Sequence, residues 1–130
     1  MKVLGGINPL YVSDVDPSSA PAFIDEVQRL DDILPIFAGE VAVDATSARY
    51  QGEWEGRDVY LAVAHGNIVN VITIPHDNPG DWAARSSFGN VVIGISAQGE
   101  SEPDLLYLPQ GSDSAPSGWR AVSRHLIARD

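Results

Sequence analysis

The feature that most restricts the fold is a pair of β-rich segments in the middle of the chain. Residues 59–64 and 68–74 are dominated by β-branched, aromatic and other apolar side chains. They are separated by His65, Gly66 and Asn67, and a Gly-Asn turn between two such segments is typical of a β-hairpin. We therefore expect an antiparallel hairpin over residues 59–74.

Other segments also have strand character. Val91–Ile95 and Leu105–Leu108 are predicted to pair with each other across residues 98–103. Shorter candidates are residues 2–12, Ile36–Phe37, Val41–Val43 and Tyr50–Trp54. Residues 76–81 are rich in turn-forming types and are predicted to be a loop. Together these segments indicate a mostly antiparallel sheet of about four to six strands.

Two segments outside the strands have apolar residues at helical spacing. The first begins near Asp16 and Pro17, an expected N-cap and first helical residue, and ends before Pro35. Its apolar stripe is Phe23, Val27, Leu30 and Leu34, with the acids Asp25, Glu26, Asp31 and Asp32 off that stripe. The second segment holds Trp119, Val122, Leu126 and Ile127. Strands flanked by helices predict an α+β fold class, with an N-terminal and a C-terminal helix.

Length and composition are those of one globular domain, which we expect to cover residues 1–130. Of the 130 residues, 44% are hydrophobic and 20% charged, as in folded proteins. Cysteine is absent, which excludes disulfides and thiolate chemistry and fits a reducing compartment. No segment approaches the ~20 apolar residues of a membrane span, and Gly5, Gly6 and Pro9 interrupt the first apolar run. We expect a cytoplasmic protein that does not bind membranes.

The net charge of -10 restricts the possible partners. A surface this negative repels phosphate backbones, so we expect no direct binding to nucleic acid. The negative charge is concentrated in residues 1–118, because the last twelve residues hold three arginines against one aspartate. Such a charge keeps small domains apart in solution. It can also steer association with a basic partner protein.

The sequence contains no recognisable catalytic or metal-binding motif. His76 with Asp77 and Asp81 is the best candidate metal cluster, but it lacks the helical spacing of known zinc motifs. Glu53 and Glu55 would share one face of a strand, where such pairs usually line a solvated sheet. Neither a Gly-x-Ser-x-Gly motif nor a phosphate-binding loop is present. The sequence thus predicts a non-enzymatic protein with no cofactor.

Aromatic residues set among acids favour protein binding instead. Tyr50, Trp54 and Trp82 each have polar or acidic neighbours, as large side chains at interfaces often do. The alternative is that Trp54 and Trp82 cap the core from strand ends. The predicted partner-binding residues are Asp31, Asp32, Glu53, Trp54, Glu55, Asp77, Asp81 and Trp82. The acids would pair with basic residues of the partner, and the tryptophans would supply buried area.

The order of elements resembles the immunity proteins of bacterial polymorphic toxin systems. The resemblance covers residues 17–128 and rests on the early helix, the central hairpin, the segment Arg85–Gly89, and Leu108-Pro109 before a final helix. It implies a small cytoplasmic protein that binds a cognate toxin domain and blocks its active site.

A second resemblance gives an alternative. Leu10–Asp16, followed by a helix containing Phe23, is similar to the opening of glyoxalase and bleomycin-resistance proteins. Ile7 occupies the usual first-ligand position and Asn90 falls near the later histidine, so the resemblance implies a metal-free small-molecule binder. It also implies βαβββ-like modules around an apolar cleft lined by residues 59–74 and 91–95.

Overall fold

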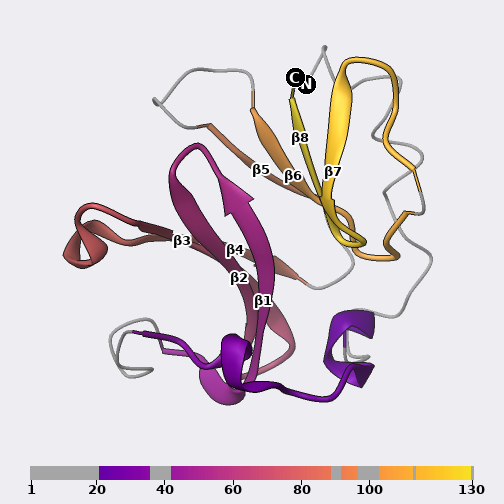
Figure 1. The fold of residues 1–130 in the computed structure, drawn as a ribbon. Coiled ribbons are helices and arrows are strands. Elements are labelled where there is room, and N and C mark those ends of the chain that lie inside the picture. The colour runs from indigo at the N-terminus through magenta and orange to yellow at the C-terminus, as the bar shows by residue number, and fades with distance from the viewer. Residues whose placement is uncertain (1–20, 36–41, 89–91, 97–102, 113, 130) are drawn as a thin grey trace.

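The computed structural model describes residues 21–35, 42–88, 92–96, 103–112 and 114–129. In these ranges the chain forms eight strands in two four-stranded antiparallel sheets that face each other (Figure 1). The first sheet has the order β1-β2-β3-β4 and the second β5-β6-β8-β7. The strands are β1 (Asp44–Trp54), β2 (Arg57–Ala64), β3 (Ile68–Pro75), β4 (Ala83–Phe88), β5 (Ile93–Ile95), β6 (Leu105–Tyr107), β7 (Trp119–Ser123) and β8 (Leu126–Arg129).

The central strands are buried on both faces, which explains their nearly continuous apolar sequence. On β2, Val59 and Leu61 point between the sheets, while Tyr60 and Ala62 belong to a second apolar cluster on the outer face. The inner core contains Phe23, from the segment before β1, and residues of both sheets: Trp54, Val59, Leu61, Val63, Val69, Val71, Ile93, Leu105, Tyr107, Leu126 and Ala128. Alternation of side chains along each strand therefore fills two layers at once.

The two sheets approach each other at both edges, where β1 contacts β7 and β4 contacts β5. At the β1–β7 edge, Gly52 adopts a φ of +130°, and a Cβ there would lie 3.3 Å from the Val122 Cγ1 atom. The Ser123 hydroxyl donates a hydrogen bond to the Gln51 side chain across the same edge. A residue without a side chain at position 52 thus allows the sheets to meet.

The predicted hairpin over residues 59–74 is confirmed. β2 and β3 pair in unbroken register from Arg57–Pro75 to Ala64–Ile68, and Gly66 and Asn67 both have positive φ in the turn. The predicted pairing of the segments near 91–95 and 105–108 is also present, as β5 with β6.

The predicted N-terminal helix is wrong in its described part. Residues 21–35 form only two 3₁₀ turns, η1 (Ala22–Asp25) and η2 (Leu30–Asp32). The carbonyls of Ile24 and Glu26 accept hydrogen bonds from the Arg49 guanidinium instead of from a helical backbone N–H. Contacts with β1 therefore outweigh the helical spacing of the apolar residues.

The predicted C-terminal helix is wrong as well, because Trp119–Ile127 form the β7–β8 hairpin. Leu126 packs in the inner core and Ile127 packs with Trp119 on the outer face of the second sheet. Two adjacent apolar residues buried on opposite faces are typical of a strand that is covered on both faces of its sheet. β8 lies between β6 and β7, so its backbone groups bond on both sides.

The fold is therefore mostly β, with two antiparallel sheets and no α-helix in the described ranges, and the expected α+β class is wrong. Tyr50–Trp54 lies in β1, but Ala42 and Val43 are not in a strand. Residues 2–12 and 36–41 lie outside the described ranges. Within those ranges, no helix has the length and apolar character needed to cross a lipid bilayer.

Candidate functional site

Three side chains able to bind a cation meet on the first sheet. Glu53 on β1 lies opposite Asp58 on β2 in the antiparallel register. His76 directly follows β3, and its backbone N–H donates to the carbonyl of Gly56 at 3.0 Å. One ligand atom from each of Glu53, Asp58 and His76 lies within 4.8 Å of the other two. We call these three residues the carboxylate–histidine cluster.

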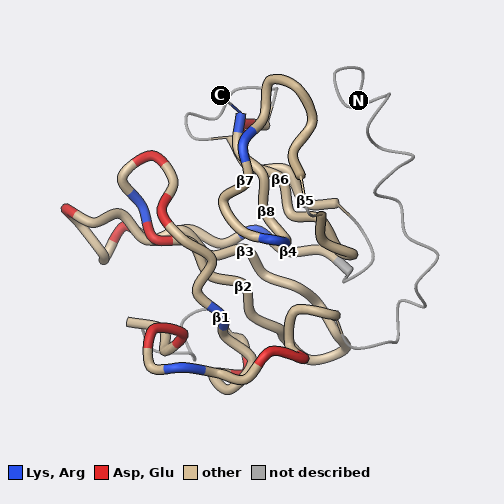
Figure 2. Tube along the Cα trace, turned by 45° about the vertical axis from the view of Figure 1, so that its right-hand side comes forward, with Lys and Arg blue, Asp and Glu red and all other residues tan. Residues whose placement is uncertain are grey.

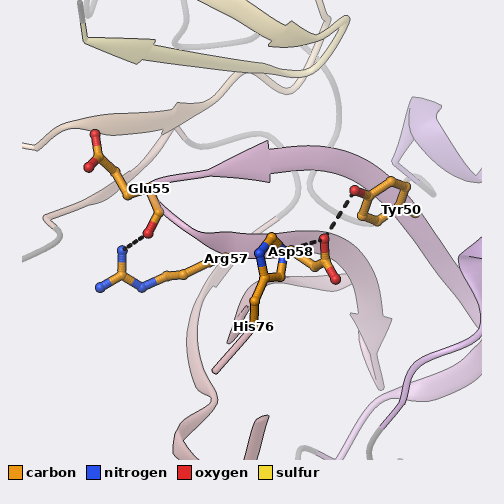
Figure 3. A network of polar contacts seen from close by, with 5 residues as sticks. All are labelled: Tyr50, Glu55, Arg57, Asp58 and His76. Carbon is orange, nitrogen blue, oxygen red and sulfur yellow. Dashed lines mark hydrogen bonds and ion pairs between the residues drawn. The ribbon is translucent and has the colours of Figure 1, made fainter. Parts of the chain in front are cut away.

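A hydrogen bond within the cluster joins His76 and Asp58. The imidazole Nε2 lies 2.9 Å from the Asp58 carboxylate (Figure 3). This hydrogen bond raises the pKa of His76, and the charges of Asp58, Glu53 and Asp77 raise the same pKa further. With the ring neutral, the cluster offers one imidazole nitrogen and two carboxylates. These groups can act as ligands of a divalent metal ion or as hydrogen-bond acceptors for a guanidinium group.

A tight turn sets the register that brings Glu53 to Asp58. Only Glu55 and Gly56 connect β1 to β2, since Trp54 already pairs with Arg57. Their φ values are +51° and +71°, as in the two-residue type I′ turn that suits the twist of a hairpin. The Arg57 guanidinium donates to the Glu55 carbonyl, and the Glu55 carboxylate points away from Asp58 (Figure 3).

Two tyrosines adjoin the cluster. The Tyr50 hydroxyl donates to Asp58 at 3.1 Å, and the rings of Tyr50 and Tyr60 lie 5.3 Å apart. Burial raises the pKa of Tyr50 to about 12, with further contributions from the Asp58 hydrogen bond and the Asp58 and Glu53 charges. Both rings therefore stay neutral at physiological pH. Partly exposed Tyr50 presents aromatic and hydroxyl surface beside Asp58, whereas Tyr60 is buried beneath it in the outer apolar cluster.

Acids from before β1 reach the same region. Burial is the largest cause that raises the pKa of Tyr60, and the charges of Asp58, Asp31 and Asp32 raise that pKa too. Tyr60 thus lies within electrostatic range of acids from two separate segments. Acidic positions gather on the turn after β1, on the loop after β3 and along the segment before β1 (Figure 2). We call Asp31, Tyr50, Glu53, Asp58 and His76 the acidic face.

The structure brings together part of the predicted binding set. Asp31 and Glu53 are exposed on the acidic face, and Asp77 acts on the His76 charge. Glu55 and Asp77 line a groove of about 410 Å³ beside Arg57 and His76. Trp82 is half-buried and packs against the outer apolar cluster of the first sheet. No described contact joins the exposed Asp81, which ends the 3₁₀ turn η3 (Pro79–Asp81), to the acidic face.

Two predicted binding residues have structural roles instead. Trp54 is only 2% exposed and lies in the core between the sheets, in line with the alternative that it caps the core. Asp32 is buried, and its carboxylate accepts the backbone N–H groups of Arg29 and Tyr50, each at 2.7 Å. Neither side chain offers its surface to a partner.

Sequence reasoning missed Asp58 and the exposed apolar residues. A two-residue Glu-Gly turn between Trp54 and Arg57 would have placed Asp58 opposite Glu53. Val27, Leu30 and Ile33 are 83%, 85% and 59% exposed. Val27 and Leu30 belong to the apolar stripe of the predicted helix, which would have buried them. Because residues 21–35 form no such helix, both side chains are exposed instead.

Comparison of the chain with protein-family models, with curated proteins and with solved structures gives no match. The two family resemblances drawn from the sequence therefore stay predictions.

Proposed function

We propose that this chain is a toxin-neutralising, immunity-type protein that binds and occludes a basic partner protein through its acidic face. The observation that carries the proposal is convergence: Glu53 and Asp58 of the β1–β2 hairpin act on Tyr50, and Asp31 and Asp32 from before β1 act with Asp58 on Tyr60. His76, from the loop after β3, bonds the same Asp58 carboxylate. The proposed setting is the cytoplasm, which a cysteine-free chain fits.

Charge supports a basic partner. The carboxylates of exposed Glu53 and half-exposed Asp58 have oxygens within 4.8 Å of each other and repel in the free protein. An arginine of a partner could donate hydrogen bonds to the carboxylates of both Glu53 and Asp58 and replace that repulsion with attraction. The net charge of -10 would also accelerate encounter with a basic surface at low ionic strength.

Apolar area supports a protein partner over a free cation. Leu30 and Ile33 lie on either side of Asp31 and Asp32 in the chain. The side chains of Leu30 and Ile33 are exposed. Partly exposed Tyr50 adds an aromatic surface beside Asp58. Interfaces combine such apolar and aromatic groups with surrounding charge. In the proposal, Leu30 and Ile33 replace Trp54 as the residues buried by the partner.

The test measures binding of purified basic C-terminal toxin domains, including any encoded beside this gene, by calorimetry and by inhibition of toxin activity. The variant Glu53→Gln/Asp58→Asn should raise the Kd of the bound domain about tenfold or more. The variant Asp25→Asn/Asp81→Asn removes as much charge outside the acidic face and should change the Kd much less. If no such domain binds tightly, or if both variants lose equal affinity, the proposal fails.

The glyoxalase-like alternative expects βαβββ modules, and the described ranges contain no α-helix. A small-ligand site does not require those modules. The pocket lined by Val71, Thr73 and Arg85 favours such a site in this chain.

A further inference from the structure

A pocket of about 310 Å³ opens between the two sheets at the edge where β4 contacts β5. Val71 and Thr73 of β3, Arg85 of β4, and Ile95 and Ser96 at the end of β5 line it. The pocket lies on the inner face of the first sheet, whereas the outer apolar cluster beside the acidic face lies on the other. Its volume is at the lower end of the range for small-molecule sites.

Thr73 supplies a polar group that has no partner among the described residues. Its side chain is buried, with 6% exposure, yet its hydroxyl makes no hydrogen bond to any residue that the structure describes. Thr73 shares the inner face of β3 with Val71, two residues away, so its side chain lines the pocket. Buried hydroxyls are normally hydrogen-bonded, so the Thr73 hydroxyl is available to bond a ligand or a water molecule in the pocket.

Arg85 supplies a positive charge at the pocket mouth. It lies directly opposite Val71 in the β3–β4 register and therefore on the inner face. Its guanidinium is exposed and forms no ion pair or hydrogen bond with a described residue, although the chain holds 18 acids. The guanidinium donors of such an arginine are available to an anion from outside the protein.

We propose that this pocket binds a small organic carboxylate. Its carboxylate would pair with the Arg85 guanidinium and accept a hydrogen bond from the Thr73 hydroxyl, while its apolar body would contact Val71 and Ile95. A monoanion is favoured over a phosphate dianion because the net charge of -10 repels higher charge more strongly. The proposal is independent of the acidic face and of any toxin partner.

The experiment is an NMR titration of the full ¹⁵N-labelled chain with benzoate, cyclohexanecarboxylate, butyrate and inorganic phosphate, with benzamide as the neutral analogue of benzoate. Saturable shifts should concentrate on the amides of β3, β4 and β5 and should be largest for a ring carboxylate. Benzamide should bind about tenfold more weakly than benzoate.

Two variants separate binding from folding. Arg85→Gln should weaken carboxylate binding about tenfold, whereas Arg120→Gln, an equal charge change at an exposed position of β7, should leave it unchanged. Thr73→Val should weaken binding while the Tm stays equal or rises, since no internal hydrogen bond is lost. The proposal is overturned if none of the carboxylates saturates, if phosphate binds more tightly than all of them, or if Arg85→Gln binds like the wild type. The last result would leave Arg85 as an inward charge that protects an edge strand.

Discussion

Two pairs of charged residues on or beside the first sheet differ in what surrounds them. Asp32 and Arg49 are each 7% exposed, and their hydrogen bonds go to backbone groups. Asp58 and His76 have side chains 33% and 42% exposed, and they contact each other. A charge fully engaged by backbone groups holds the fold, while a half-exposed charge with a titratable partner can still meet a ligand. A cluster of acids in the sequence does not show which of its members is held by the fold and which can meet a ligand.

Arg49 should give the largest effect. Its guanidinium donates to the carbonyls of Ile24, Glu26, Thr46 and Ala48, so it fastens residues 21–35 to β1. Arg49→Met should lower the free energy of unfolding by about 3 kcal/mol, because four buried or partly buried carbonyls lose a donor. Urea denaturation measures this, with Arg120→Met as the exposed control. Equal stability of both variants would show that the backbone bonds of Arg49 are not needed to hold the fold.

The neighbours Asp31 and Asp32 should respond oppositely. Asp32→Asn cannot accept both backbone N–H groups through two oxygens, so the free energy of unfolding should fall by about 1–2 kcal/mol. Asp31→Asn alters an exposed charge and should leave stability nearly unchanged, while it slows association with a basic partner. Denaturant unfolding and association kinetics measure the two responses. Similar behaviour of the two variants in both measurements would contradict the contrast.

His76 should give the smallest effect on stability. Its pKa is raised in the folded state, chiefly by the Asp58 hydrogen bond, so the protonated ring favours folding. That contribution is complete below the unfolded pKa of about 6.5 and disappears as the pH rises through the higher folded value. His76→Gln should therefore destabilise the protein more at acidic than at alkaline pH. NMR titration should show the His76 pKa falling in Asp58→Asn and unchanged in Asp81→Asn.

The sequence predicted the central hairpin because its signal is local. Two β-rich segments and a Gly-Asn turn fix that element without reference to the rest of the chain. Leu126 and Ile127 were harder, because their spacing from Trp119 suits a helix as well as a strand buried on both faces. Only the position of β8 between β6 and β7 decides between the two structures.

The candidate site was predictable only in part for a similar reason. Acidity and aromatic neighbours indicated Asp31, Glu53 and Asp77, yet the same pattern includes Asp32 and Trp54, which are buried. Burial of Asp32 depends on the backbone N–H of Tyr50, a residue far along the chain. Asp58 and His76 come together with Glu53 through strand register, which composition does not report.

The turn at Glu55 and Gly56 has a consequence for how the acidic face could be lost in descendants of this sequence. A β-branched residue at Gly56 would find open space around its Cβ, yet the φ of +71° would oppose it. A slip in the β1–β2 pairing would then separate Glu53 from Asp58 while every acid remained in place. A related sequence would therefore keep the acidic face only if it kept the two-residue turn and its glycine as well as the acids.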